Sequence, residues 1–110
     1  MIKFQCVVQE GCIPELIRPD LEQAISRISL EILGNDQGPV DISWSEIPKG
    51  FGFRGGEPST SSLVRGQIPD GCDTETRKEL LINLSRSWYD ISGTTEEELV
   101  ISARDMSWQG

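Results

Sequence analysis

Apolar and polar residues follow a strand, helix, strand pattern in the second half of the chain. Residues 63–68 (LVRGQI) are rich in extended-favouring residues, and the Pro-Asp-Gly that follows ends them as a turn would. Asp73 can cap a helix, and apolar residues then recur at three- and four-residue spacing, which predicts a helix of about five turns. The predicted core stripe is Leu81, Leu84, Trp88 and Ile91. Gly93 occupies a left-handed cap position, and 99–103 (LVISA) predicts the second strand of a parallel β-α-β unit.

The first half of the chain repeats this pattern. Residues 2–8 and 40–47 alternate as strands, and apolar spacing between them predicts a helix from about Ile13 to Leu33, whose first turn Pro19 should bend. The Gly-Cys pair at 11–12 recurs 60 positions later at 71–72. We therefore interpret the chain as a tandem duplication of one β-α-β unit.

A glycine-rich stretch at 50–56 (GFGFRGG) joins the two units. It formally matches G-x-G-x-x-G, but a dinucleotide loop must open into a helix, whereas here a serine-rich segment and a strand follow. Glycines interleaved with Phe51 and Phe53 instead predict a tight hairpin that lays aromatic side chains over a neighbouring surface. Residues 57–62 (EPSTSS) are predicted to be the linker between the repeats.

Length and charge narrow the function classes. We expect the 110 residues to form one domain, with repeat one at 1–57 and repeat two at 63–110. A net charge of -8 argues against binding to nucleic acid or to an anionic membrane surface. The sequence has no apolar run of about 20 residues and no signal-peptide pattern, so we expect a cytoplasmic protein.

The residue types available limit the chemistry. The absence of histidine excludes Ser-His-Asp and Cys-His arrangements and histidine-based metal sites within the chain. We expect neither a metal nor a cofactor, and we expect the three cysteines to be reduced. Carboxylates, thiols, lysines and the α-amino group remain as acid–base groups.

The order of these motifs carries a family resemblance. A strand ending at Glu10-Gly11, a long helix, a second strand, and Ile47-Pro48-Lys49-Gly50 leading into 55–57 (GGE) resemble the tautomerase superfamily, in particular a fused, two-repeat 4-oxalocrotonate tautomerase. Macrophage migration inhibitory factor shares that architecture. The resemblance implies an α+β, two-layer fold: a tandem β-α-β repeat with a four-stranded mixed sheet and both helices on one face. It also implies a homotrimer with the sheets turned inward.

The family's chemistry depends on an amino-terminal proline, exposed after removal of methionine, that acts as general base beside arginines that bind substrate carboxylates. Ile2 occupies the proline's position here, and we expect Met1 to be retained because isoleucine is bulky. The two family arginines correspond to Cys12 and Asp41. The family's catalytic set is therefore expected to be missing.

Three hypotheses follow. The favoured one is a tautomerase-fold protein without proline-dependent activity, either a structural trimer or one that binds a small-molecule carboxylate, with Phe51, Phe53, Arg54 and Arg65 as candidate binding residues. The second is a keto-enol tautomerase in which the Met1 amine replaces the proline and the two arginines bind the carboxylates. The third is a thiol activity at Cys12 and Cys72, which precede the two predicted helices and could be stabilised there as thiolates.

Overall fold

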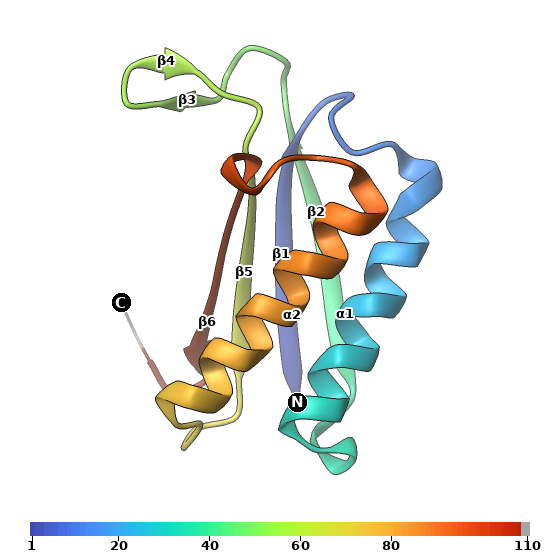
Figure 1. Ribbon diagram of the computed structural model, residues 1–110, viewed down its shortest axis with the longest axis vertical. Helices are drawn as coiled ribbons and strands as arrows, with labels where there is room; N and C mark the ends of the chain where they lie inside the picture. Colours follow the sequence, from blue (N-terminus) through green and yellow to red (C-terminus); the bar gives the residue numbers. More distant parts are fainter. Residues whose placement is uncertain (109–110) are drawn as a thin grey trace.

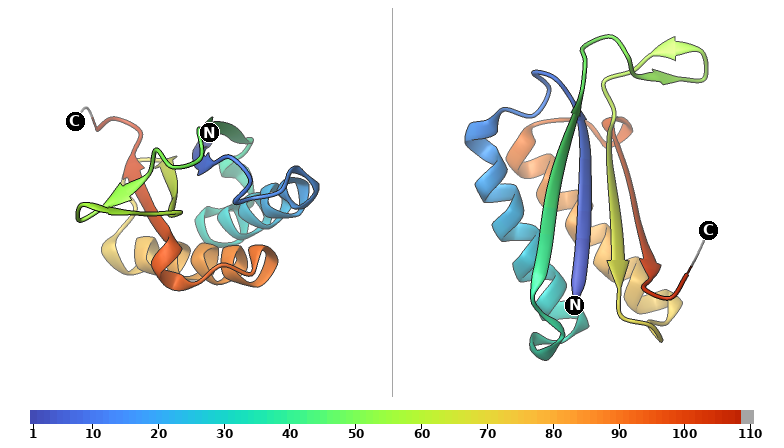
Figure 2. Two further views of the ribbon diagram at one scale, coloured as in Figure 1. Left: turned by 90° about the horizontal axis from the view of Figure 1, so that it is seen from above. Right: turned by 180° about the vertical axis from the view of Figure 1, so that it is seen from behind.

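The computed structural model describes residues 1–108 and consists of two layers, a sheet and a pair of helices (Figure 1). The sheet contains β1 (Ile2–Gln9), β2 (Val40–Ile47), β5 (Ser62–Ile68) and β6 (Leu99–Asp105), in the order β2-β1-β5-β6. The helices α1 (Arg18–Leu33) and α2 (Thr74–Ser92) lie together on one face of the sheet (Figure 2). The predicted α+β architecture is confirmed.

Each half of the chain forms one parallel β-α-β unit. β1 pairs with β2 and β5 pairs with β6 in parallel, whereas β1 and β5 pair antiparallel in the middle of the sheet. The mixed sheet follows from this arrangement, because each helix connects two parallel strands of its own unit. The last two residues of the second predicted repeat, 109–110, lie outside the described residues.

The core lies between the sheet and the helices. Alternate residues of β1 face the helices and are almost fully buried: Ile2, Phe4, Cys6 and Val8. α1 contributes Leu21, Ala24, Ile25 and Ile28, and α2 contributes Leu80, Leu84 and Trp88. This single cluster accounts for the period of two in the strands and the three- and four-residue spacing in the helices.

Two sequence predictions about the helices need correction. α1 begins at Arg18, after a short 3₁₀ turn at Glu15–Ile17, and not at Ile13. Pro19 is therefore in the first turn of α1, where a missing amide proton breaks no hydrogen bond within the helix. In α2, Leu80 is buried where Leu81 was expected to be, and Leu81 lies half-buried at the edge of the core.

A small hairpin projects from the end of the sheet, as the glycine-rich stretch predicts (Figure 1). Its strands are β3 (Phe53–Arg54) and β4 (Glu57–Pro58), and they pair antiparallel. Gly55 and Gly56 form the two-residue loop with φ of 57° and 83°, the left-handed values that such a turn requires. Because residues 57–58 form β4 and Ser62 begins β5, only 59–61 of the predicted linker lie between strands.

The buried side chain of Gln9 holds the base of the hairpin against the sheet. Its amide nitrogen donates to the carbonyl of Ser59, and its carbonyl oxygen accepts from the backbone amide of Gly50 at 3.3 Å. One side chain at the end of β1 thus bonds both the segment that enters the hairpin and the segment that leaves it.

In the part of the chain that the structure describes, no helix is both long and apolar enough to cross a membrane.

Candidate functional site

The sheet face opposite the helices is not covered by another element (Figure 2, right), and its side chains form rows across all four strands. The pairing register defines each row. The first row is Asp41, Lys3, Gln67 and Arg104. The second row is Ser43, Gln5, Arg65 and Ser102, and the third row is Ser45, Val7, Leu63 and Val100. The open face is therefore polar where β1 begins and more apolar in its third row.

Residues of the first two rows line a hollow of about 380 Å³ on this face. Three of its side chains are cationic, Lys3, Arg65 and Arg104, and one, Asp41, is acidic. In a chain of net charge -8 this is a local excess of positive charge. Such a floor favours a small anion, because guanidinium and ammonium groups donate strong hydrogen bonds to carboxylate oxygens.

The two arginines are positioned by neighbours on the sheet. Arg65 donates from Nη2 to Oε1 of Gln5 at 3.1 Å, which orients its guanidinium across the central strand pair. The guanidinium of Arg104 lies 5.5 Å from the ring centre of Trp108. Its Nε is buried and has no hydrogen-bond partner among residues 1–108.

Ile2, at the position of the family's catalytic proline, is part of the core and of the sheet end in this chain. The side chain of Ile2 is fully buried against the helices, and its backbone amide donates to the carbonyl of Pro39 at 3.0 Å. In the chain that retains Met1, the nitrogen at this position is therefore a hydrogen-bonded amide without basic character. Met1, 51 % exposed, directly precedes β1 at the end of the sheet where the first row lies.

The structure does not place all the predicted binding residues on the open face. Arg65 is in the second row, whereas Arg54 lies in the hairpin and donates to the carbonyl of Glu97 at 2.7 Å. Phe51 and Phe53 are 70 % and 64 % exposed at the hairpin, so within one subunit their rings are largely uncovered. Arg54 and Arg65 therefore have different partners on different elements.

The candidate thiols lie at opposite ends of the molecule, because each follows one of two antiparallel strands. Cys72 precedes Asp73, which caps α2 by accepting from the amide of Thr76 at 2.7 Å. Burial raises the pKa of the Cys72 thiol, against the opposing effect of Arg77. The neutral thiol is thus favoured at Cys72, contrary to the thiolate that the sequence analysis suggested. Burial also raises the pKa of Cys6 to about 12.

Four of the polar residues that line the hollow were not predicted from the sequence as binding residues: Lys3, Gln5, Gln67 and Arg104. Their signal was the alternation of each strand, since each of them directly follows a buried residue that faces the helices. Only the register between strands shows that they converge.

Across the described residues 1–108, histidine, cysteine, aspartate and glutamate side chains form no group of three or more able to hold a metal ion. The hollow instead offers ammonium and guanidinium donors, with the Asp41 carboxylate on the strand beside Lys3. The three cationic side chains can bind an anion, and the Asp41 carboxylate would then lie next to that anion.

No protein-family model and no curated protein matches the sequence. Solved structures do match. Ps01740 superposes with a TM-score of 0.86 at 24 % identity, over 94 % of this chain and 92 % of its own. The symmetric trimer of wild-type fused 4-OT superposes with a TM-score of 0.82 at 18 % sequence identity, and the match covers 94 % of this chain and 84 % of the fused 4-OT chain. MIF2 of Leishmania major superposes with a TM-score of 0.79 at 18 % sequence identity, and the match covers 100 % of this chain and 92 % of the MIF2 chain.

These likenesses establish the class of fold. The chain has the fold of the tautomerase superfamily, and the resemblance seen in the sequence is confirmed at that level. At such identities the agreement concerns the backbone and does not extend to activity.

Proposed function

We propose that this protein is a homotrimer that binds a small carboxylate on the open face of its sheet and lacks proline-dependent tautomerase activity. The observation that carries the proposal is the cationic floor of the hollow, where Lys3, Arg65 and Arg104 outnumber the single carboxylate of Asp41. A ligand with one or two carboxylates satisfies these donors, and Gln5 and Gln67 offer further amide hydrogen bonds.

The third row of the open face supports the trimer. Val7, Leu63 and Val100 form an apolar strip, and Val100 is 49 % exposed in the single subunit. Turning the sheets inward removes such a strip from water. The similar fused 4-OT is described as a symmetric trimer, and the same assembly here would place the three hollows around a central space.

The environment of Ile2 supports the loss of the proline mechanism. A general base needs a free electron pair, but the Ile2 nitrogen is an amide that donates to Pro39. Proline at this position would lose that hydrogen bond and the buried isoleucine side chain.

Calorimetric titration with cis,cis-muconate, a stable dicarboxylate, tests the binding. We expect saturable binding that Arg65→Ala or Arg104→Ala weakens about tenfold, the effect of losing one charge-assisted hydrogen bond pair. Lys49→Ala is the matched control, because it removes one positive charge from an exposed turn outside the hollow. Equal affinity in all three variants would contradict the proposal. Sedimentation equilibrium should give three times the 12.2 kDa chain mass.

The second candidate is a tautomerase that uses the Met1 amine as base, favoured by the position of Met1 at the charged end of the open face. In that case Arg65 binds the substrate carboxylate. Phenylenolpyruvate turnover that disappears when the α-amine is acetylated would establish this candidate. No turnover before acetylation, together with muconate binding, would leave the binding function alone.

A further inference from the structure

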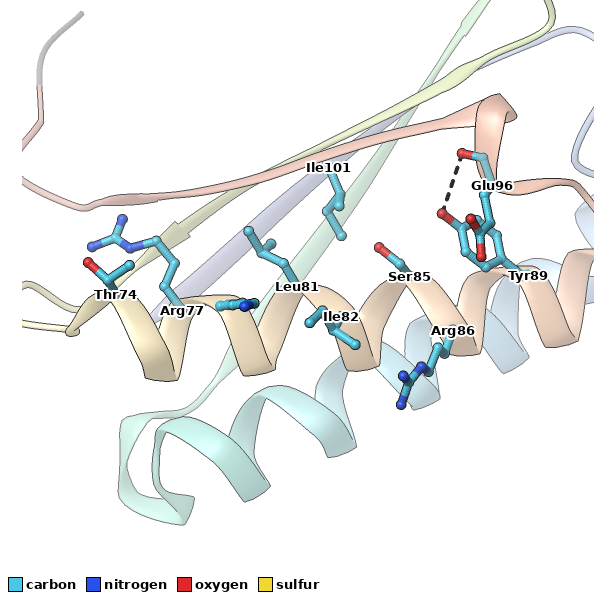
Figure 3. Close-up of a pocket in the computed structure, with 10 residues that line it drawn as sticks. Thr74, Arg77, Leu81, Ile82, Ser85, Arg86, Tyr89, Glu96 and Ile101 are labelled. Carbon is cyan, nitrogen blue, oxygen red and sulfur yellow. Dashed lines mark hydrogen bonds between the residues drawn. The ribbon is translucent and has the colours of Figure 1, made fainter.

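A second groove lies on the helix side of the molecule, between α2 and the edge strand β6 (Figure 3). It has a volume of about 720 Å³, nearly twice that of the hollow on the open face. The side chains of Leu81, Ser85 and Tyr89 point from α2 towards β6, from which Ile101 points back (Figure 3). The two grooves are on opposite faces of the sheet and share no lining residue.

The floor of this groove is apolar and elongated along α2. Leu81, Ile82 and Ile101 supply aliphatic surface, and Ile82 is 38 % exposed. Tyr89 closes the far end, where its hydroxyl donates to the carbonyl of Glu96 at 3.4 Å (Figure 3). Lys78 to Tyr89 spans about 16 Å along the helix axis, at 1.5 Å per residue.

Charge is distributed unevenly along the groove. Arg77, Lys78 and Arg86 line it, although the chain has only 10 basic residues in all. Arg77 is already bonded to the carboxylate of Asp105 and the carbonyl of Ala103, each at 2.7 Å. Lys78 and Arg86 remain to meet a ligand, but they lie about 12 Å apart along the helix axis. Arg86 is in the same half of the groove as Glu96, the one acidic side chain that lines it, whereas Lys78 is in the other half. The groove therefore favours an elongated apolar molecule with one anionic head at the Lys78 end.

We propose that this groove binds an alkyl carboxylate of medium chain length. The carboxylate pairs with Lys78, and the alkyl chain lies over Leu81, Ile82 and Ile101. Lys78 is preferred to Arg86 as the partner of the carboxylate because Glu96 offsets the positive charge at the Tyr89 end. Burying the chain against this floor supplies most of the affinity, because apolar surface leaves water.

Titration with decanoate below its micelle concentration tests this site. In the Arg65→Ala variant, which weakens the carboxylate site on the open face, we expect one saturable decanoate site per chain. Lys78→Ala should weaken that site about fivefold, since an exposed ion pair contributes up to about 1 kcal/mol. Lys49→Ala, which removes an exposed charge elsewhere, should bind decanoate as the parent chain does. Ser85→Phe should occupy the half-buried centre of the groove and abolish binding while circular dichroism stays unchanged. Equal affinity of the Lys78 and Lys49 variants would overturn the proposal.

Two further probes test whether the carboxylate head contributes to binding and whether the groove binds a free alkyl carboxylate or a lipid surface. Decanol should bind more weakly than decanoate and should be insensitive to Lys78→Ala, and equal affinity of the two would refute the role of the head group. Phosphatidylglycerol vesicles should not retain the protein, and retention that depends on Lys78 would make the surface a lipid-contact site and overturn the proposal. Decanoate binding that persists in Arg65→Ala belongs to the groove, so failure here and failure of the carboxylate site on the open face are distinguishable.

Discussion

Arg18 and Arg77 make the same contacts in the two β-α-β units. Each donates to the backbone carbonyl five residues earlier, Ile13 at 3.0 Å and Cys72 at 3.2 Å. Each also pairs with the carboxylate near the end of its unit's second strand, Arg18 with Glu46 at 2.6 Å and Arg77 with Asp105 at 2.7 Å. The start of each helix is thus tied to the far end of the strand that follows it.

Replacing either arginine should therefore destabilise the fold. Arg18→Ala should lower the free energy of unfolding by about 2 kcal/mol, because a hydrogen-bonded charge and its partners lose their contacts. Arg77→Ala should cost less, since the Arg77 side chain is 29 % exposed against 12 % for Arg18. Urea denaturation measures both effects. Arg27→Ala, in an exposed pair within α1, is the control and should cost at most about 0.5 kcal/mol. A cost for Arg18→Ala equal to that control would contradict the structural role.

A second prediction concerns Gly66, which pairs with Phe4 across β1 and β5. A Cβ at Gly66 would lie 2.5 Å from Cε1 of Phe4 and 3.0 Å from the carbonyl oxygen of Ser102. Gly66→Ala should cost about 1–3 kcal/mol by overpacking. In the Phe4→Leu background the penalty should be smaller, although the Ser102 contact preserves part of it. A penalty that is the same in both backgrounds would show that Phe4 does not restrict this site.

Most of the fold could be predicted from alternation and helical spacing. The predicted strand at 40–47 has the observed bounds, and Gly93 is the left-handed cap with φ of 73°. The start of α1 was placed too early because apolar Ile13 and Ile17 continue the helical spacing through a 3₁₀ turn. Leu81 was preferred to Leu80 because both fit a stripe at this spacing, and only the packing against the sheet decides between them.

The candidate site was less predictable. Arg65 could be named from its residue type, but Lys3 and Arg104 are far from it in sequence. They meet only because β1 and β5 pair antiparallel with Lys3 opposite Gln67, a register that no local pattern encodes. Arg54, the other arginine named from the sequence, lies in the hairpin and donates to the carbonyl of Glu97 instead.

The cap of α2 should make stability depend on pH. The backbone amide of Thr76 donates to Asp73 and lowers the pKa of that carboxyl in the folded state. Its contribution to stability is present above the pKa of the unfolded chain, about 4, and is lost as the pH falls through the lower folded value. Asp73→Asn caps without titrating, so its unfolding free energy should fall less between pH 6 and pH 3, measured by urea denaturation. An identical acid dependence in the two proteins would contradict this contribution.

Cys6 and Cys72 should react with maleimide at different rates. Cys6 is buried with its pKa raised to about 12, so it should be modified only on unfolding. Cys72, whose pKa is also raised, should react more slowly than an unstructured peptide thiol. Mass spectrometry of peptides after timed labelling gives the rates. Modification of Cys72 faster than the peptide thiol would instead support the thiol-activity hypothesis.

Because β1 and β5 pair antiparallel, each position in the first β-α-β unit has an equivalent in the second unit at the opposite end of the sheet. By the repeat spacing, Lys3, Asp41, Gln67 and Arg104 of the first row correspond to Leu63, Val100, Val7 and Ser45 of the third. The same four places thus carry charge and amides at one end and mostly aliphatic groups at the other. In the proposed trimer, equivalent positions of the two β-α-β units thus have different roles: the first row binds the anion, and the third row lies between subunits.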